Sequence, residues 1–445
     1  MNHPSRSACA LALLATATLG ATCGQAAGTA APGVLTPREA RIASAARAQV
    51  APAIGLLERL VNINSGTMNR TGVTQVGRVM MDELGKLGFT VRWVPMDSVG
   101  RAGHVVAVHA GSGHGRKMLL IGHLDTVFDL DSPFQRFERR GDIAEGPGVN
   151  DMKDGLSIMV AALRALQETG DLRNADVRIV LSGDEENAGT PTTVSRADMI
   201  DAAKHSDVAL EFEALATQDG HDMGSISRRS SASWSLRATS RSGHSSGIFS
   251  EGVGDGAVYE MARILDAFRR DLREPNATYN VGLVVAGAGA ELNEAETAGH
   301  ATGKTNVIPA EAIARGDLRT LSNEQTERLM ARMRAIAGQH LAETSAELAF
   351  SESYPAMPPT AGNRRLLAML NDINSGLGLE PMAELDPLRR GAGDIAFVAD
   401  RVDGLVGFGG VGQGSHAPGE TVDLRSFDRQ IQRTALLIAR LAQQR

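Results

Sequence analysis

Runs of apolar residues alternate with amphipathic segments over the first half of the chain. Short apolar runs predict strands at residues 89–94, 104–109, 118–121, 177–181 and 208–212. Apolar residues at helical spacing predict helices over about residues 36–61, 73–87 and 157–166. This alternation is typical of an α/β fold built on a mostly parallel sheet.

The pattern changes near residue 226 and changes back near residue 353. Between these points it predicts a strand, a helix, two strands, a helix and a strand, at residues 233–240, 257–272, 279–285, 313–318, 324–336 and 346–350. This order fits a small α+β sandwich inserted in a larger domain. The α/β pattern then resumes, with helices at 364–373, 395–400 and 426–441 and a strand at 405–408. We therefore expect a catalytic domain in two parts, 28–225 and 353–445, around an insertion at 226–352.

Residues 1–27 are expected to be a signal peptide. Arg6 lies in a short polar start, residues 8–22 are small and apolar, and small residues around Gln25, Ala26 and Ala27 suit cleavage. The apolar run is too short for a membrane span. We therefore expect a periplasmic or secreted protein. Cys9 and Cys23, the only cysteines in the sequence, lie in this segment, so the mature chain would have no disulfide and no thiolate ligand.

Length and charge narrow the class of protein further. A chain of 445 residues is long enough for two domains. Its 45 Lys and Arg against 52 Asp and Glu give a net charge of −7, and this balance argues against a nucleic-acid partner.

Acidic residues and histidines follow the predicted strands of the larger domain. They are His123 and Asp125 after residues 118–121, Asp151 in a Gly-rich turn before a helix, Glu185 and Glu186 after 177–181, Glu213 after 208–212, and His416 after a Gly-rich strand at 405–410. The carboxyl ends of parallel strands meet at one edge of a sheet, where ligands bind. These side chains can therefore converge on one site.

Such a group of carboxylates repels itself unless cations neutralise it. Three carboxylates and two imidazoles suit two divalent ions about 3.5–4 Å apart, bridged by one carboxylate. We expect Asp151 to be the bridge and Asp125 to hydrogen-bond His123. Glu185 would be the base for the bridging water. The remaining ligands would be His123 and Glu213 for one ion, and Glu186 and His416 for the other, with Glu211 as an alternative to Glu213.

These motifs resemble those of the di-zinc metallopeptidases that include glutamate carboxypeptidase, aminoacylase, succinyl-diaminopimelate desuccinylase and peptidase T. The resemblance covers most of the mature chain and rests on residues 123–127, 146–155, 184–186, 210–213 and 414–418. It favours Glu213 over Glu211. Asp154 stands where such proteins commonly have Gly, and Gly419 where an acidic or polar residue is common.

The resemblance also implies roles for the insertion, which would be a lid that often forms dimers. His244, in the segment 242–246, would reach a neighbouring active site and stabilise the oxyanion. Asn306 would contact the substrate. Arg319 would hold a substrate carboxylate, as would one residue of the pair Arg389 and Arg390. The cofactor would be two Zn²⁺ ions per subunit, with Co²⁺ or Mn²⁺ as substitutes.

The function that follows from this resemblance is zinc-dependent hydrolysis of an amide bond. We expect a carboxypeptidase that releases a C-terminal amino acid, glutamate being one candidate, from a peptide or N-acyl conjugate. The alternatives are an N-acyl-amino-acid deacylase or a dipeptidase of the same fold, and, in another class, a periplasmic binding protein without turnover. Glu185 argues against the last, since binding alone needs no base.

Two other motifs compete with this interpretation and are discounted. Residues 243–247 fit the G-x-S-x-G pattern of serine hydrolases, but the preceding segment is polar and no helix follows at once. Residues 407–412 fit G-x-G-x-x-G, but they are not followed by a helix.

Overall fold

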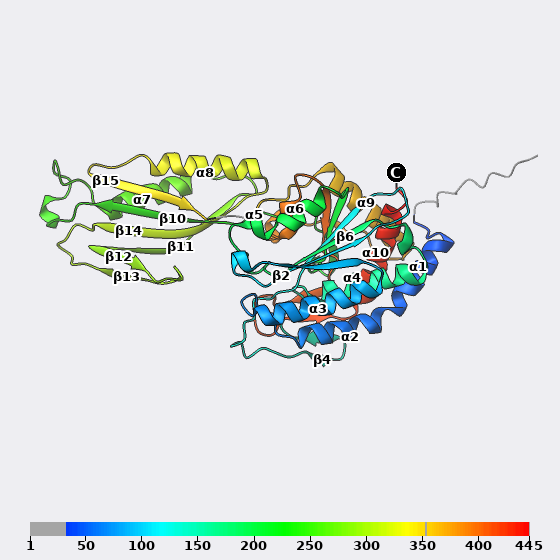
Figure 1. Cartoon of the computed structure of the whole chain (residues 1–445). Helices are drawn as coiled ribbons and strands as arrows, with labels where there is room; N and C mark the ends of the chain where they lie inside the picture. The colour runs from blue at the N-terminus through cyan, green and yellow to red at the C-terminus, as the bar shows by residue number, and fades with distance from the viewer. Residues whose placement is uncertain (1–32, 352–353, 445) are drawn as a thin grey trace, which may run out of the picture. The chain divides into compact units, whose positions relative to one another are not determined.

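The computed structural model describes residues 33–351 and 354–444 (Figure 1). The expected signal peptide lies outside the described residues. Within them, no helix combines the length and the hydropathy that a membrane span requires.

The centre of the fold is a six-stranded sheet. Its strands, in spatial order, are β1(Thr90–Pro95), β2(Gly103–His109), β6(Val177–Ser182), β3(Met118–His123), β7(Val208–Glu211) and β17(Asp403–Val406). Strands β6, β3, β7 and β17 are parallel, whereas β2 is antiparallel to both β1 and β6. The predicted mostly parallel sheet is confirmed, and its three central parallel strands are those that the acidic and histidine motifs follow.

Both faces of this sheet are covered. Successive side chains of a strand point to opposite faces, and the two sets of side chains belong to two different cores. In β3, Met118 and Leu120 belong to a large core with helices from both ends of the chain, whereas Leu119 and Ile121 belong to a smaller core with α6(Ala197–Ala203). The helices of the large core are α1(Pro37–Ala48), α2(Val50–Val61), α3(Arg70–Lys86), α4(Lys153–Glu168), α9(Ala361–Gly376) and α10(Ser426–Leu441).

Two helix predictions need correction. The predicted helix over 36–61 is two helices that meet at Gln49; its start is as expected, with a capping box between Thr36 and Glu39. The predicted helix over 395–400 is wrong, because only a single 3₁₀ turn forms, at Asp394–Phe397. Ile395 N–H donates to the buried Glu211 instead of continuing a helix, and the chain soon enters β17.

The predicted insertion contains a separate antiparallel sheet, which we call the inserted sheet. Its order is β11(Thr278–Gly287), β14(Glu311–Arg319), β10(Ala232–Ser240) and β15(Thr344–Phe350). Its core contains α7(Ala257–Asp271) and α8(Asn323–Ala337), so the predicted order of strands and helices is confirmed. Gly316 leaves room for the Trp234 ring, which a Cβ at this position would meet. The exact domain boundaries remain a prediction.

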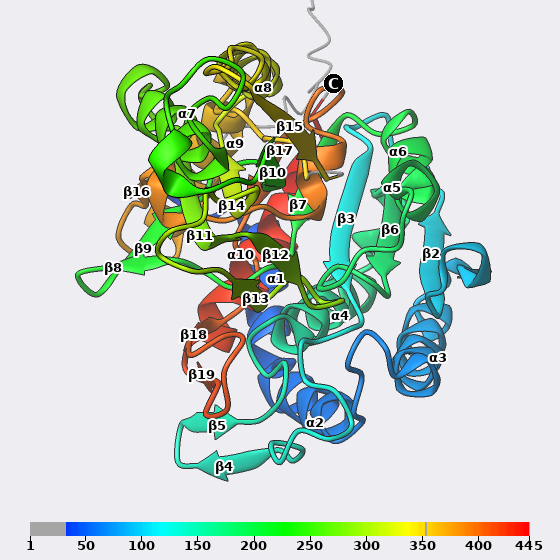
Figure 2. The same ribbon diagram turned by 90° about the vertical axis from the view of Figure 1, so that its left-hand side faces the viewer.

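The remaining strands form small sheets. A hairpin in the insertion, β12(Gly289–Leu292) and β13(Gly299–Thr302), was not expected. Figure 2 shows another small sheet, ordered β18(Val411–Gln413), β19(Thr421–Asp423), β5(Ile143–Glu145) and β4(Glu138–Arg140). A third sheet is ordered β16(Ala383–Glu384), β9(His221–Gly224) and β8(Thr217–Gln218). Pairing of β19 with β5 places the loop that carries His416 beside the Asp151 turn.

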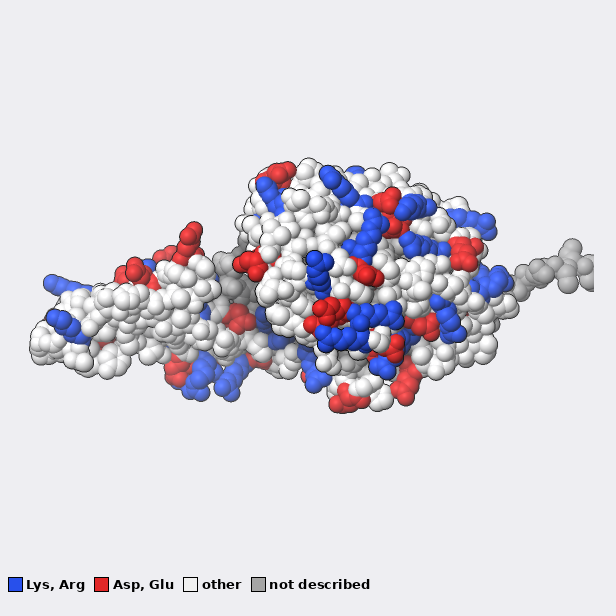
Figure 3. Space-filling model, turned by 90° about the horizontal axis from the view of Figure 1, so that it is seen from below, with Lys and Arg blue, Asp and Glu red and all other residues white. Residues whose placement is uncertain are grey.

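Neither positive nor negative charge dominates the face of the molecule seen in Figure 3. Basic and acidic side chains are interspersed there, and this face of the described residues has no continuous basic stripe.

Candidate metal centre

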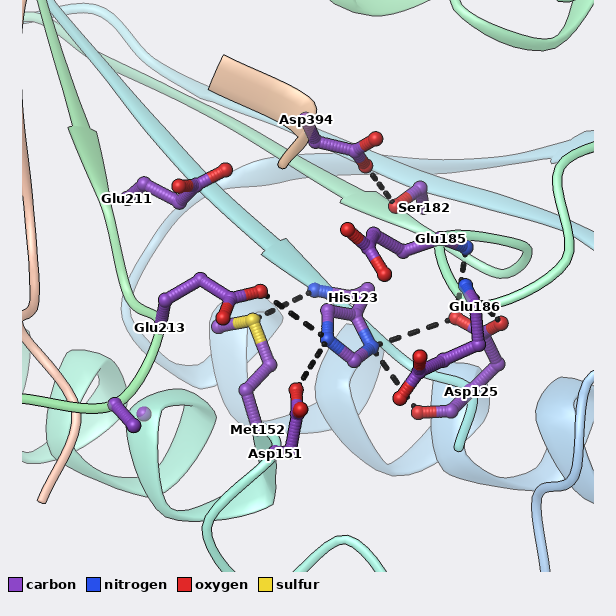
Figure 4. A network of polar contacts seen from close by, with 12 residues as sticks. His123, Asp125, Asp151, Met152, Ser182, Glu185, Glu186, Glu211, Glu213 and Asp394 are labelled. Atoms are coloured by element: carbon purple, nitrogen blue, oxygen red, sulfur yellow. Dashed lines mark hydrogen bonds and ion pairs between the residues drawn. The ribbon is translucent and has the colours of Figure 1, made fainter. Parts of the chain in front are cut away.

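Three adjacent parallel strands deliver the first group of site residues to one edge of the central sheet. His123 is the last residue of β3, and it pairs with Ser182 at the end of β6. Glu185 and Glu186 follow β6, and Glu213 follows β7. Figure 4 shows these side chains gathered around the His123 ring. The expected convergence at the carboxyl edge is thus observed.

Asp151 reaches the same place from a turn that a buried carboxylate fixes. Glu420 accepts backbone N–H groups from Gly148 at 3.1 Å, Asn150 at 2.7 Å and Asp151 at 2.9 Å. Gly148 has φ +69°, and a Cβ there would meet Thr126. Glu420 comes from the loop after His416, so it ties the Asp151 turn to the last ligand segment.

Asp151 lies between the two imidazoles. One carboxylate oxygen, Oδ1, lies 3.2 Å from His123 Nε2, and Oδ2 lies 3.1 Å from His416 Nε2. Glu213 Oε1 lies 3.5 Å from His123 Nε2, and Glu186 Oε2 lies 3.1 Å from His416 Nε2. Two groups therefore share Asp151, and each could hold a cation. This is the arrangement expected of a carboxylate that bridges two ions.

The electrostatics of these groups fit bound cations. Burial disfavours a charged His123 ring, but Asp125, Asp151 and Glu213 outweigh burial and raise the pKa of His123 well above its ordinary value. Hydrogen bonds to Asp151 and Glu186 raise the pKa of His416 to about 11. Burial is the main cause that raises the pKa of Glu186 to about 7. In the metal-free protein, protons therefore offset the carboxylate charge that divalent ions would otherwise offset.

One oxygen of Glu186 also points to a missing ligand. Its Oε1 atom is buried and has no hydrogen-bond partner among the described residues. A buried carboxylate oxygen without a partner is costly, and a metal ion would satisfy it. The nitrogen and oxygen donors of these five residues therefore fit the metal pair that the sequence predicts.

Asp125 lies behind His123, as expected of a carboxylate that orients a metal-binding imidazole. Its Oδ1 atom is 3.4 Å from His123 Nδ1. Asp125 also accepts hydrogen bonds from the Thr67 hydroxyl at 2.6 Å and from the backbone N–H groups of Glu185 and Glu186 at 3.0 and 3.1 Å. One carboxylate thus orients the His123 ring and the turn that carries the proposed base.

The structure favours Glu213 over Glu211 as the ligand. Glu211 is buried, and its two oxygens accept hydrogen bonds from Arg228 Nη1 at 2.6 Å and from Ile395 N–H at 2.8 Å. Glu213 instead faces His123. Glu211 therefore has a partner already, whereas Glu213 is directed to the site.

A cavity of about 350 Å³ adjoins the centre. Its lining combines carboxylates and an imidazole with guanidinium groups. The lining residues that carry these groups are Asp151, Glu185, Glu213, His416, Arg228, Arg319, Arg389 and Arg390. The structure therefore brings the proposed base and all three predicted carboxylate-binding arginines to one cavity. Burial raises the pKa of Glu185 well above its ordinary value, which suits a proton acceptor.

Arg228 is a residue of this cavity that the sequence analysis missed. The only signal for it was the doublet Arg228-Arg229 in a polar segment, which is also common at protein surfaces. Glu420, which follows the motif at 414–418, was given no role by the sequence analysis. Its position shows that it holds the Asp151 turn.

His244 and Asn306 do not line this cavity. They lie together in the insertion, where Ser245 N–H donates to the Asn306 carbonyl at 3.0 Å and His244 forms a bridge with Val307. In the described residues, Nδ1 of the exposed His244 ring lies 2.8 Å from the Ser246 hydroxyl and accepts from the Ser246 backbone N–H at 3.2 Å. Their action on a neighbouring active site remains a prediction.

The two discounted motifs do not form the structures that their chemistry requires. Ser245 lies in an exposed 3₁₀ turn, Ser245–Gly247, rather than on a tight turn between a buried strand and a helix. The segment 407–412 leads from β17 into β18, not into a helix. The described residues therefore give neither motif its expected context.

Comparison with known proteins agrees with this geometry. The chain is 28% identical to carboxypeptidase G2 of Pseudomonas sp. (strain RS-16) over 396 residues, which cover 86% of this chain and 88% of that protein. It is 28% identical to succinyl-diaminopimelate desuccinylase of Novosphingobium aromaticivorans over 393 residues, 86% of this chain and 97% of that protein.

A similar fold occurs in the crystal structure of aminopeptidase PepT from Bacillus cereus, with a TM-score of 0.69 and 15% identity over 88% of this chain and 99% of that one. The sequence model of peptidase family M20/M25/M40 matches residues 119–444, which include every proposed metal ligand. The chain therefore belongs to the peptidase family M20/M25/M40, a family of metal-dependent hydrolases.

Proposed function

We propose that this chain is a di-zinc carboxypeptidase that releases a C-terminal amino acid from a peptide or an N-acyl conjugate. The observation that carries the proposal is the composition of the cavity. It is lined by Glu185 and three of the predicted metal ligands together with Arg319, Arg389 and Arg390. A guanidinium group binds a carboxylate through two parallel hydrogen bonds, so a free C-terminal carboxylate can be held while its amide bond faces the metal ligands.

Different residues of the centre would bind the metal ions and transfer the proton during hydrolysis. When bound, zinc supplies Lewis-acid polarisation of the scissile carbonyl and acidifies water. His123, Asp151 and Glu213 would hold one ion, and Asp151, Glu186 and His416 the other. Glu185 would take a proton from the attacking water and pass it to the leaving nitrogen.

Two features separate Arg389 from Arg390. Arg390 Nη2 donates to the Ala214 carbonyl at 2.6 Å, and Arg390 Nε is buried without a hydrogen-bond partner in the described residues. Arg389 is exposed at the cavity rim. A substrate carboxylate would satisfy the buried Nε atom, so we assign the primary carboxylate contact to Arg390.

Similarity supports two substrate classes. The relationship to carboxypeptidase G2 supports release of a C-terminal residue, with glutamate as one candidate. The relationship to succinyl-diaminopimelate desuccinylase supports the alternative of an N-acyl-amino-acid deacylase. A dipeptidase of the same fold would use the same centre. Zinc is proposed as the metal because two His and three carboxylates are common zinc ligands, although such oxygen-rich sites also accept Co²⁺ or Mn²⁺.

Export and dimerisation complete the proposal. The pattern of residues 1–27 supports a periplasmic or secreted enzyme. The family resemblance supports a homodimer through the lid, in which His244 and Asn306 of one subunit would serve the centre of the other. His244 would help to hold the oxyanion there.

The test is hydrolysis of a panel by the purified mature chain. The panel contains N-acyl amino acids, dipeptides and a folate-type glutamate conjugate, each assayed as isolated, after chelation and after zinc is restored. We expect release of a C-terminal amino acid that chelation abolishes and zinc restores. The absence of turnover on every member, with two zinc ions bound per chain, would instead support the binding-protein alternative.

A further inference from the structure

The two chain segments that lead into and out of the inserted sheet lie side by side. Arg228 and Met357 exchange two backbone hydrogen bonds, of 3.0 and 2.9 Å, and Ser231 and Tyr354 exchange two more, of 3.1 and 3.0 Å. We call residues 228–231 and 354–357 the connecting ribbon. It is a short antiparallel ladder, so its two segments are fixed to each other.

The first segment of the ribbon contacts a proposed metal ligand. Arg228 is buried, and its Nη1 atom lies 2.6 Å from Glu211 and 3.7 Å from Glu213 Oε2. Its Nε–H donates to the Gly391 carbonyl at 3.0 Å. The other oxygen of Glu213 faces His123. Arg228 therefore holds Glu213 from the side opposite the proposed metal.

The second segment contacts the turn that carries the proposed base. The Tyr354 hydroxyl donates to the Glu185 carbonyl at 2.9 Å and accepts from Arg196 Nη2 at 2.6 Å. Arg196 is fully buried, and its guanidinium also binds Asp184 at 2.6 Å and Asp394 at 2.7 Å. Tyr354 thus joins the ribbon to a buried network beneath Glu185.

We propose that Arg228 and Tyr354 are positioning residues, through which the connecting ribbon sets the positions of Glu213 and Glu185. Each segment of the ribbon contacts a different residue of the centre, one ligand and one base. A twist of the ribbon, as in any movement of the insertion, would therefore displace the Glu213 side chain and the Glu185 backbone together. The proposal rests on the proposed function for the role of Glu185, but the role of Arg228 can be tested by metal binding alone.

The first experiment measures zinc affinity. R228M and R228K are compared with wild type by competition with a chelating dye of known affinity. Loss of a residue that supports a metal ligand commonly weakens metal binding about 10–100-fold. We expect such a loss at one of the two sites in R228M and partial rescue in R228K, because Lys restores the charge but cannot reach Glu211 and Gly391 at once.

R433M is the matched control. Arg433 is also almost fully buried and ion-paired, at 2.7 Å from Asp222, but it contacts none of the proposed ligands. This control separates loss of a buried ion pair from loss of positioning. Equal zinc affinity in R228M and R433M would overturn the role of Arg228.

The second experiment removes one oxygen atom. Y354F should lower kcat about 10–100-fold, the usual range for such supporting groups, while KM and zinc affinity stay within about twofold, because the substrate cavity and the ligands are intact. Y279F, in β11 of the inserted sheet, is the control and should leave kcat unchanged. An unchanged kcat in Y354F would overturn the role of Tyr354.

If wild type hydrolysed no member of the panel, the proposed function would fail, whereas the zinc experiment would still decide the role of Arg228.

Discussion

Single carboxylates define much of this centre through the groups that they contact. Asp151 faces one imidazole with each oxygen, Asp125 orients a ring and a turn, and Glu420 accepts three backbone N–H groups. Glu185 differs from them, because burial raises the pKa of its carboxyl group well above the ordinary value. Carboxylates of this centre therefore have different chemical roles because their surroundings differ.

The role of Glu185 predicts the behaviour of E185Q. The substitution keeps the shape of the side chain and removes the proton acceptor. We expect kcat to fall about 10²–10⁴-fold, the usual contribution of general acid–base catalysis, while two zinc ions stay bound. The measurement is kcat together with metal content, and Glu251→Gln in the exposed loop before α7 is the control. Retained activity in E185Q would remove Glu185 from the mechanism.

The role of Glu420 predicts the behaviour of E420Q. An amide has one acceptor oxygen, so it cannot bind the N–H groups of Gly148, Asn150 and Asp151 through both ends as the carboxylate does. The Asp151 turn should loosen, and zinc affinity should fall about 10–100-fold. Competition with a chelating dye measures this change. Affinity equal to that of wild type would show that the turn holds its shape without Glu420.

At the scale of elements, the structure shows which parts of the fold follow from local sequence. The apolar runs and helical stripes predicted the central strands and helices correctly, because burial on a sheet or helix face imposes their period. The hairpin β12 and β13 was missed, since residues such as Gly289 and Ala290 have low strand propensity and pair only within the insertion. Arg228 and Tyr354 could not be identified, because their contacts depend on the pairing of segments distant in sequence.

Helix α10 is joined to β9 by ion pairs whose effect depends on pH. Burial acts to raise the pKa of Asp222, but hydrogen bonds from Arg429 and Arg433 outweigh it and hold the pKa below its ordinary value of 3.8. A carboxyl group whose pKa is lower in the folded state stabilises that state at pH values above its ordinary pKa. This stabilisation is lost as the pH falls through the lower pKa of the folded state.

D222N should therefore destabilise the protein in a pH-dependent way. At about pH 7 we expect a loss of about 1–3 kcal/mol in the free energy of unfolding, because two guanidinium groups lose their charged partner. The difference from wild type should shrink as the pH falls below 3.8 and through the lower pKa that Asp222 has in the folded state. Urea unfolding of the metal-free protein measures it. D428N is the control. Asp428 also lies in α10, but its ion pair with Arg47 of α1 is more exposed, so this substitution should change the stability little.

At the scale of the whole molecule, the proposed role of His244 depends on the proposed dimer. In the described residues, His244 lies in the insertion and does not line the cavity that contains Glu185. The family resemblance predicts that it acts on the centre of a neighbouring subunit. H244A alone should lower kcat about 10²–10³-fold, the usual cost of losing one oxyanion donor.

Mixed dimers would decide between action within and between subunits. A dimer of one E185Q chain and one H244A chain keeps one complete centre only if His244 acts on the partner, because that centre combines Glu185 of one chain with His244 of the other. We expect purified mixed dimers with distinct affinity tags to regain activity that neither parent has. Mixed dimers as inactive as their parents, or a chain that is monomeric by light scattering, would contradict this prediction.

The proposed ligands are distributed along most of the chain. His123 stands before the insertion and His416 long after it, and Asp151 is shared by the group with His123 and Glu213 and the group with Glu186 and His416. The second group cannot exist until the last quarter of the polypeptide has been made and β19 has paired with β5. Metal uptake at this group therefore reports completed biosynthesis and folding. A truncated or misassembled chain would keep His123, Glu186 and Glu213 but could not assemble the pair of ions on which the proposed hydrolysis depends.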